Sequence, residues 1–531
     1  MKPRLEKKFE RVASRRASRR WLWSVLMSAM LVGICLQPQM LTAKDSNKAK
    51  ATLTDKGITM AVSTDLLFDP GVSSHLIDVK TVEGIVTLSG TVDNIQSKER
   101  AVTIAKSIRG VRAVVDEMKV KPAARTDDQI RADIENALLR DPATDSYEVK
   151  VRVNDGIATL SGEVQSWQER QLSAEVAKGV RGVKNVKNEI AWKWTSNRSD
   201  AEIRADIERR LQSDIWVNDG LVSVSVQDGK VKLSGSAGSA IEKTYAARDS
   251  WVAGVEEVDD SALTIDPWLR DKARRSSRMP PAKTDDEIAK AVQDAFRYDP
   301  RVYSFNPTVE VNNGVVTLSG VVENLQAKRA AERDAQNTVG AWRVVNMLKV
   351  RPPNPPSDAE IAKEIRQALD ASPFVDRFDV VVRVVNQKAY LSGLADSPFE
   401  KAEAGRVAES VGAVVEVQNN VDLRNYTYAR FYPYAYPYWN YYAYNNRPLT
   451  LGTLDRSADT DRLLKQEIEN QFFWSPFVDS DEVSVTVEDG VATLRGTVDS
   501  RMEQGAAIDN AYQAGAVSVR NELKVNGKSA S

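Results

Sequence analysis

The 531-residue chain has a single cysteine, Cys35, and a single histidine, His75. One thiol excludes a disulfide framework and a cysteine-based metal site. One imidazole leaves zinc without the several His or Cys ligands that tetrahedral sites use, and no HExxH, nucleophile-elbow or phosphate-loop motif accompanies it. Paired carboxylates remain an open alternative for acid–base chemistry, but the recurrent acids Asp155, Asp228 and Asp489 fall in expected turns. The sequence therefore predicts a protein that is not an enzyme and has no metal or other cofactor.

An excess of charge of either sign is also missing, with 73 Lys and Arg against 74 Asp and Glu. Nine of the 73 lie in the first twenty residues, before an apolar run at Trp21–Leu36 and a small residue at Ala43. This order predicts an export signal at 1–43, and hence a periplasmic or secreted protein. Sixteen apolar residues are short for a membrane span, so an uncleaved anchor is the alternative. Cleavage would leave 64 basic and 72 acidic residues, a balance that argues against a nucleic-acid partner.

What the chain does contain is one segment repeated six times. Each copy has a Gly, then three residues, then Leu-(Ser/Arg)-Gly, and a further Gly about twenty residues later. In the fifth copy Gln387 replaces the first Gly, which makes that hairpin turn less certain. We interpret the glycines as turn and cap positions: Gly84, Gly90, Gly110, Gly156, Gly162, Gly182, Gly229, Gly235, Gly254, Gly314, Gly320, Gly340, Gly393, Gly412, Gly490, Gly496 and Gly515.

The second copy predicts the structure of the unit. Thr126 and Gln129 form a capping box that opens a helix, and similar boxes begin at Ser199, Thr284 and Ser357. Two alternating strands joined at a tight turn follow, then a second helix and a third strand. The predicted class is α+β, with tandem αββαβ modules in which two helices cover a three-stranded mixed sheet. Units of 65 to 70 residues are near the lower limit for independent folding, so neighbouring copies should pack together.

The capping helix, the V-x-V-x-x-G-x-V-x-L-x-G hairpin and the later Gly-Val resemble the BON domain. The match predicts repeats at 54–122, 126–193, 199–266, 284–352, 357–424 and 460–526. BON domains are typical of bacterial envelope proteins, often osmotic-stress proteins of the periplasm, and are associated with phospholipid membranes. The resemblance implies an envelope protein that acts by binding.

Two joins between copies differ from the others. The 267–283 linker is basic, and the 425–459 insert is rich in Tyr and Pro. Each is either a solvated linker or a contact surface, the first for anionic headgroups and the second for a membrane interface, a glycan or another copy. The sixth copy adds four large aromatics between Phe472 and Phe477, more than one core stripe needs. The candidate lipid or partner contacts are Trp268, Arg270, Arg274, Arg275, Arg278, Tyr432, Tyr434, Tyr436, Tyr438, Trp439, Tyr441, Tyr442, Phe473 and Trp474.

These patterns favour peripheral association with phospholipid membranes, through modules that are weak singly and act together by effective concentration. Envelope maintenance or protection against osmotic stress would be the wider role. The alternative is an interaction scaffold that docks envelope proteins or associates with itself.

Overall fold

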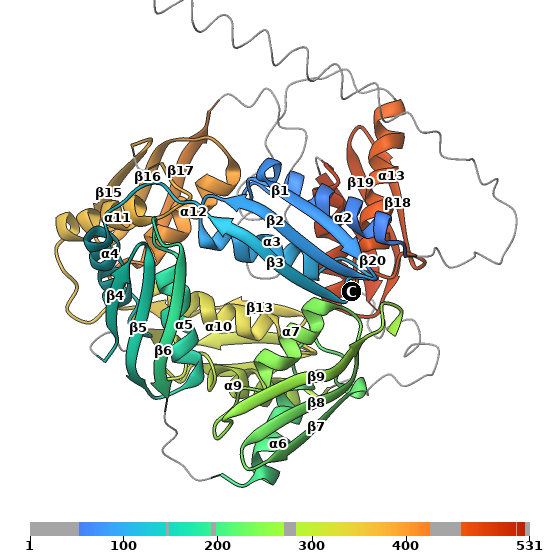
Figure 1. Ribbon diagram of the computed structural model, residues 1–531, viewed down its shortest axis with the longest axis horizontal. Helices are drawn as coiled ribbons and strands as arrows, with labels where there is room; N and C mark the ends of the chain where they lie inside the picture. The colour runs from blue at the N-terminus through green and yellow to red at the C-terminus, as the bar shows by residue number, and fades with distance from the viewer. Residues whose placement is uncertain are drawn as a thin grey trace, which may run out of the picture. The chain divides into compact units, whose positions relative to one another are not determined.

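The computed structural model describes residues 53–144, 148–192, 198–269, 283–376, 378–424, 458–516 and 518–525. Leu53–Ser531 forms one compact unit. Within it, each of the six repeats has the order helix, strand, strand, helix, strand (Figure 1). The predicted α+β class and the αββαβ module are therefore confirmed.

The elements recur at equivalent places in the six repeats. The first helices are α2 (Asp55–Phe68), α4 (Asp127–Arg140), α6 (Asp200–Leu211), α9 (Asp285–Phe296), α11 (Asp358–Ala371) and α13 (Ala458–Trp474). The hairpins are β1 (Ile77–Val82) with β2 (Ile85–Val92), β4 (Lys150–Asn154) with β5 (Ile157–Val164), β7 (Val222–Gln227) with β8 (Lys230–Ala237), β10 (Thr308–Asn312) with β11 (Val315–Ser319), β15 (Val380–Val385) with β16 (Lys388–Ala395), and β18 (Val483–Glu488) with β19 (Val491–Val498).

The second helices and last strands complete each module. The second helices are α3 (Ile95–Lys106), α5 (Trp167–Lys178), α7 (Ala240–Asp249), α10 (Leu325–Gln336), α12 (Pro398–Glu409) and α14 (Arg501–Gln513). The last strands are β3 (Ala113–Val120), β6 (Asn185–Trp192), β9 (Glu257–Ile265), β13 (Arg343–Asn346) with β14 (Lys349–Val350), β17 (Glu416–Leu423) and β20 (Ser518–Val525). Repeat 4 also has the short strand β12 (Val321–Val322), and single 3₁₀ turns, η2 (Ser74–Leu76) and η3 (Asp219–Leu221), precede β1 and β7.

In every sheet the second hairpin strand lies in the middle. It pairs antiparallel with the first strand and parallel with the last, as β2 does with β1 and β3. The second helix is the crossover that parallel pairing requires. Alternate residues of the middle strand face the helices, so that Val86, Leu88 and Val92 are almost fully buried against α2 and α3. Burial of side chains of this size contributes roughly 1.5–3 kcal/mol each.

Each hairpin turn is held by an aspartate from the first helix. Asp127 accepts hydrogen bonds from the backbone N–H of Asp155 and of Gly156, at 2.8 and 2.9 Å. The same two-bond clamp forms in all six repeats, and its acceptors are Asp55, Asp127, Asp200, Asp285, Asp358 and Asp461. The four predicted capping boxes are present beside these aspartates. The N-terminus of each first helix therefore fixes the turn of its own hairpin.

Two glycine positions show why the repeat needs them. Gly90 has φ +111°, and a Cβ there would lie 2.1 Å from the carbonyl oxygen of Leu76. In the fifth repeat the turn forms without its glycine, since Asn386 and Gln387 adopt φ of 51° and 63° under the Asp358 clamp.

Gly412 differs from the sequence interpretation. Ile85 and Lys388 are the first residues of equivalent middle strands, and they pair with Ala113 and Glu416. Gly110 lies three positions before Ala113, whereas Gly412 lies four positions before Glu416. Gly412 also lies outside the positive-φ residues. The cap position of repeat 5 is thus taken by the next residue, an alanine.

The second helices link repeats 1, 2 and 3 in a closed cycle. Ile95, at the start of α3, packs into the core of repeat 2. Trp167, at the start of α5, stacks on Trp251 of repeat 3 with ring centroids 4.8 Å apart. Ala240, at the start of α7, packs into the core of repeat 1. Neighbouring copies therefore complete one another's cores, as their small size predicts.

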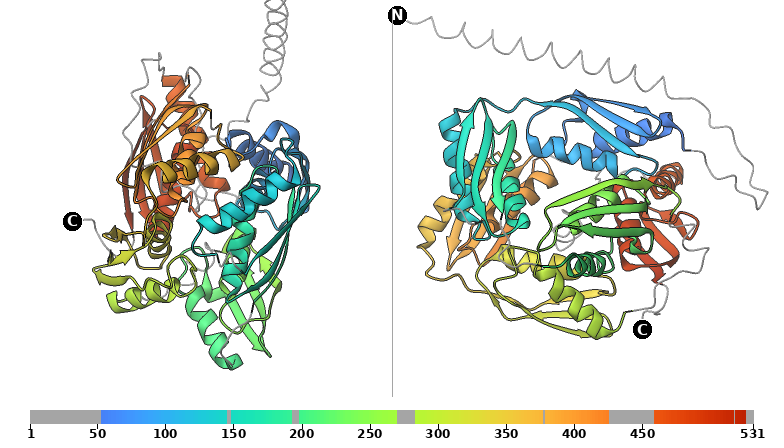
Figure 2. Two further views of the ribbon diagram at one scale, coloured as in Figure 1. Left: turned by 90° about the vertical axis from the view of Figure 1, so that its left-hand side faces the viewer. Right: turned by 60° about the horizontal axis from the view of Figure 1, so that its bottom comes forward.

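In the second half, the start of one second helix again packs into the core of the next repeat, and the last three repeats pair with the first three in reverse order (Figures 1 and 2). Leu325, at the start of α10, lies in the core of repeat 5. Three of the backbone hydrogen bonds between the halves recur at equivalent places: Arg109 N–H to the carbonyl of Trp474 (repeats 1 and 6), Arg181 to Ala371 (2 and 5) and Val339 to Ser213 (4 and 3), at 2.9, 2.6 and 2.8 Å. Each donor lies directly before the cap glycine, and each acceptor at or just beyond the end of a first helix. The chain therefore folds back on itself between repeats 3 and 4.

Candidate functional site

Three of the predicted contact residues come together at the joint of repeats 1 and 6. The ring of Trp268 lies beneath the Arg109 guanidinium, 4.9 Å from its centroid to the central carbon. Phe473 lies 6.4 Å from Trp268 and 5.0 Å from Trp474, centroid to centroid. These residues come from sequence positions some two hundred apart, so the fold assembles one aromatic cluster around a single cation. We call Trp268, Phe473, Trp474 and Arg109 the aromatic cluster.

The three rings of the aromatic cluster are half-buried, whereas Arg109 is buried, with 6% of its surface exposed. Trp474 packs against the core of repeat 1, while Phe472 and Phe477 are buried in repeats 6 and 3. Of the four aromatics that seemed too many for one stripe, two are therefore core residues. Only part of Phe473 and of Trp474 is left for an outside contact.

The start of the basic segment is anchored beside this cluster. The backbone N–H of Trp268 donates to the Asp266 carboxylate at 3.1 Å, and Leu269 is buried. Arg270, Arg274, Arg275 and Arg278, together with Tyr432, Tyr434, Tyr436, Tyr438, Trp439, Tyr441 and Tyr442, lie outside the described residues, as does the predicted signal at 1–43. The structure thus fixes one end of the predicted basic surface.

Arg109 and Arg181 are functional positions that sequence reasoning missed. The Arg109 side chain donates from Nη2 to the carbonyl oxygens of Ser475 and Val478, at 2.6 and 3.0 Å. Arg181 makes the equivalent bonds to Ser372 and Val375, at 2.6 and 2.7 Å. Both arginines precede a cap glycine, and this shared place in the repeat was the available signal.

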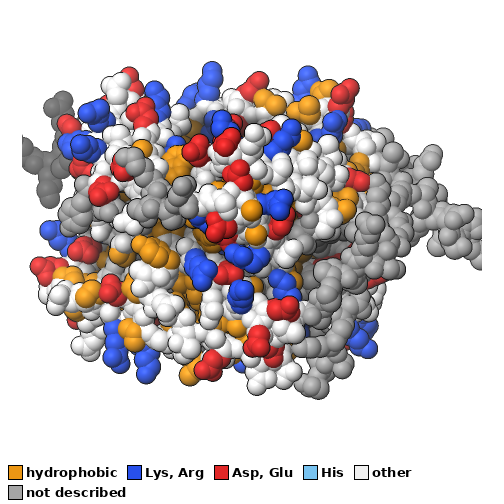
Figure 3. Space-filling model, turned by 90° about the horizontal axis from the view of Figure 1, so that it is seen from below, with side chains coloured by type: hydrophobic (Ala, Val, Ile, Leu, Met, Phe, Trp, Pro, Cys, Tyr) orange, Lys and Arg blue, Asp and Glu red, His pale blue; other side chains and the backbone are white. Residues whose placement is uncertain are grey.

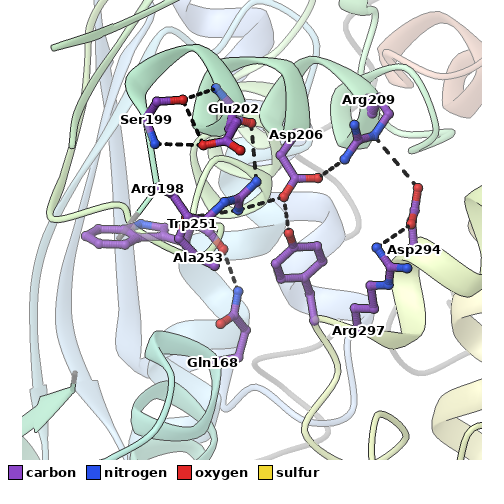
Figure 4. Close-up of polar contacts among 11 residues, drawn as sticks. Gln168, Arg198, Ser199, Glu202, Asp206, Arg209, Trp251, Ala253, Asp294 and Arg297 are labelled. Carbon is purple, nitrogen blue, oxygen red and sulfur yellow. Dashed lines mark hydrogen bonds and ion pairs between the residues drawn. The ribbon is translucent and has the colours of Figure 1, made fainter. Parts of the chain in front are cut away.

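A network of ion pairs fills the junction of repeats 2, 3 and 4 (Figure 4). Asp206 on α6 accepts from Arg198 at 2.9 Å, and also from Arg209 and from the Tyr298 hydroxyl of repeat 4. Arg209 reaches Asp294 on α9 at 3.8 Å. The Asp206 hydrogen bond and burial together raise the pKa of Tyr298 to about 12. The network therefore ties two repeats together through one aspartate.

Behind it lies a cavity of about 280 Å³ that contains buried carboxyl groups. Arg248 pairs with Asp214 at 2.9 Å and with Asp249 at 3.1 Å. Burial, with the neighbouring Asp249 carboxylate, raises the pKa of Asp214 well above its usual value, whereas the arginines hold that of Asp249 low. Because each carboxylate already faces an arginine, this arrangement stabilises the joint of repeats 3 and 4.

The structure places the remaining aromatic and titratable candidates outside any reactive cluster. His75 lies exposed in η2. Trp167, Trp251 and Trp342 lie at joints between repeats. Trp342 is 42% exposed beneath the Arg501 guanidinium of repeat 6. Among the described residues, no group of three or more His, Cys, Asp or Glu side chains is placed to hold a metal ion.

The surface offers no field of one sign on the face drawn in Figure 3, where basic and acidic side chains are interspersed. Within the described part of the chain, no helix has the length and apolarity to cross a membrane.

Comparison with known proteins identifies the repeats. The BON domain matches at residues 54–122, 126–193, 199–267, 284–352, 357–425 and 460–527. Osmotically-inducible protein Y of Escherichia coli K12 is 36% identical over 154 residues, 28% of this chain and 77% of that protein. A protein encoded in the gshII 5′ region of Anaplasma centrale is 29% identical over 140 residues, 25% of this chain and 91% of its own length.

Among solved structures, CdsD, a structural protein of the type III secretion system of Chlamydia trachomatis, matches 42% of this chain and 98% of its own. The identity is 14% and the TM-score 0.12, too low to establish a shared arrangement. The six matched segments, by contrast, span most of the sequence. The chain belongs to the BON domain family and contains six copies of that domain.

Proposed function

We propose that this protein is exported to the periplasm or beyond and acts there, without catalysis, by peripheral binding to phospholipid membranes. The observation that carries the proposal is the aromatic cluster at the joint of repeats 1 and 6. It brings three aromatic residues of an interfacial type to one place, and it lies where the basic segment begins. Similarity to an osmotically inducible protein supports a role in envelope maintenance or protection against osmotic stress.

The physical basis is local, because the chain as a whole has no net positive charge. Each Lys or Arg near an anionic surface contributes about 1 kcal/mol, and Trp and Tyr rings favour the headgroup region. Six basic residues, Arg270, Lys272, Arg274, Arg275, Arg278 and Lys283, oppose the single acidic Asp271 between Trp268 and Thr284. Their summed attraction is enough for reversible, salt-sensitive association.

Liposome flotation tests this proposal. Residues 44–531 are mixed with zwitterionic or anionic vesicles at low and high salt. We expect binding to anionic vesicles that weakens with salt, and a loss of that binding when the four arginines between 270 and 278 become serine. A matched control replaces four exposed cations of other repeats: Arg112, Lys150, Lys184 and Lys232. No flotation under any condition would overturn the proposal, as would equal effects of the two sets of changes.

A second candidate function, a protein-interaction scaffold, is favoured by the sheets. The outer strands of each three-stranded sheet pair with no strand of another repeat among the described residues, so their edges are open to an extended peptide. On the open face of the first sheet, Val82, Ile85 and Val115 are 54%, 39% and 42% exposed. Envelope proteins captured in a pull-down, with no flotation, would favour this function over lipid binding.

A further inference from the structure

We infer that the arginine before the cap glycine is a pairing code that selects which BON repeats join. The interaction surface is the loop that carries Arg109 in repeat 1 or Arg181 in repeat 2. Its partner is a BON repeat whose first helix is followed directly by the sequence Ser-Pro-Phe-Val-Asp. Only two repeats of this chain have that sequence, repeat 5 at 372–376 and repeat 6 at 475–479.

The partner loop needs an outside cation for a physical reason. The last carbonyl groups of a helix lack intrahelical hydrogen-bond donors and carry the negative end of the helix dipole. Neither α11 nor α13 has a basic residue in its last turn. In each joint the backbone N–H of the partner repeat's arginine reaches the carbonyl of the last helical residue. Its guanidinium reaches the carbonyls of the serine directly after the helix and of the valine three residues further on. The cation that these helices lack is thus supplied by another repeat.

The other four repeats satisfy this position differently. The loop after the first helix begins with a serine in repeats 5 and 6, which we call a Ser-type loop, and with an aspartate in repeats 1 to 4, which we call an Asp-type loop. Each of these aspartates already pairs with another arginine: Asp69 with Arg100, Asp141 with Arg301, Asp214 with Arg248 and Asp299 with Arg333, at 2.6 to 3.1 Å. An Asp-type loop therefore has its arginine, whereas a Ser-type loop still requires one.

The residue before the cap glycine follows the same division. It is Arg in repeats 1 and 2, but Ala253 in repeat 3 and Val339 in repeat 4. Repeats 3 and 4 join through the backbone hydrogen bond from Val339 to Ser213. A mismatch would bury a guanidinium without free acceptors, or leave helix-end carbonyl groups without donors, and both are costly. The code therefore restricts repeats 1 and 2 to repeats 5 and 6 as partners, and leaves repeat 3 to pair with repeat 4.

A cleavable form of the chain tests the inference. A protease site is placed within 270–282 of the 53–531 unit, and the folded protein is cut into two halves of three repeats. Dissociation of the halves on dilution is then measured by analytical ultracentrifugation. We expect the unsubstituted halves to stay together, and the double variant Arg109→Ala, Arg181→Ala to dissociate about a hundredfold more readily, roughly tenfold for each arginine.

The matched control is Arg112→Ala with Lys184→Ala. These exposed cations lie two residues after the same cap glycines and make none of the bonds between repeats that the two arginines make. We expect the control to change dissociation by less than about threefold. Equal dissociation of the two double variants would overturn the inference, and so would separation of the unsubstituted halves at the same dilution as the arginine variant.

Hydrogen exchange on the uncut chain gives a second measurement that does not depend on cleavage. In the arginine variant, the amides of residues 109 and 181 should exchange faster, because their acceptors lie across the loosened joints. The amide of Val339 bonds to Ser213 in the joint of repeats 3 and 4, where no arginine precedes the cap glycine. Its exchange should be unchanged. Faster exchange at all three amides would show general destabilisation and overturn a pairing role. The conservative change to lysine should restore part of the protection, since one charge is kept and the two-acceptor geometry is lost.

Discussion

Asp65 makes the joint of repeats 1 and 6 sensitive to pH. It lies on α2 facing α13, where burial raises its pKa from 3.8 to about 7. The carboxylates of Glu467 and Asp69 add to the rise, and a hydrogen bond with Gln471 opposes it. The folded protein therefore binds this proton more tightly than the unfolded chain does. The stability that Asp65 contributes is greatest below about pH 4 and falls as the pH rises toward 7, where it levels off.

The size of the effect follows from the shift. A rise of roughly three pKa units corresponds to about 4 kcal/mol for a fully buried group. Asp65 keeps part of its surface exposed, and solvent screening reduces the figure to about 2 kcal/mol. Asp65→Asn removes the ionisation but keeps a side chain that can hydrogen-bond Gln471. We expect the variant to be about 2 kcal/mol more stable than the parent at pH 8 and equal to it near pH 4.

Urea unfolding of the 53–531 unit at both pH values measures the difference, with the free energy of unfolding taken from the midpoint and slope. Asp78→Asn, an exposed aspartate on β1 of the same repeat, is the control and should shift neither midpoint. A parent-to-variant difference that is the same at pH 4 and pH 8 would refute the reasoning, since a pKa of Asp65 that differs between the folded and unfolded states must make the gap depend on pH.

Four further changes test the fold itself by thermal unfolding. Gly496→Ala should lower the free energy of unfolding by about 2 kcal/mol or more, because its Cβ would lie 1.9 Å from the Glu482 carbonyl oxygen at φ +135°. Gly505→Ala lies in α14, where an added Cβ would meet no atom within 4 Å, and should instead raise the free energy of unfolding by up to about 1 kcal/mol. Gln387→Gly should stabilise by about 1 kcal/mol, since it relieves a left-handed backbone at φ 63°, and an unchanged Tm would contradict that strain. Trp167→Ala should cost about 3 kcal/mol by removing the stack between repeats 2 and 3, and a cost as small as that of an exposed residue would contradict the packing.

The module was predictable because its signals are local. Turn glycines, capping boxes and strand alternation act over a few residues, and six copies in register remove most of the ambiguity that one copy leaves. Gly412 shows the limit of this reasoning. A one-residue shift in spacing is hard to see in sequence, but the strand register shows it directly. The aspartate clamp was missed for a related reason. The two backbone groups that it holds lie 28 and 29 residues after the aspartate and meet it only in the folded module.

The joints were much less predictable than the modules. Half-buried tryptophans at second helices fit a core reading equally well, and only the neighbouring repeat shows that Trp167 stacks on Trp251 instead. Trp268 was selected as the aromatic residue of the basic linker, and Phe473 and Trp474 because aromatics are concentrated at the end of α13. That they meet around Arg109 depends on the pairing of repeats 1 and 6, which brings together segments far apart in the sequence.

The pairing of repeats also bears on how binding would work. If six modules were flexibly linked, their avidity would follow from linker length and effective concentration. In the compact unit the modules are held by backbone hydrogen bonds and shared cores, so their relative positions are set by packing and not by linkers. Avidity then depends on which binding surfaces of the modules face the same side. The second helices of several modules pack against other repeats, so these helix faces are not available to partners. What remains for partners is the open face and edges of each sheet, together with the aromatic cluster at the one joint beside the basic segment. Substitutions on the sheet faces and at the cluster should therefore separate protein binding from lipid binding within a single intact fold.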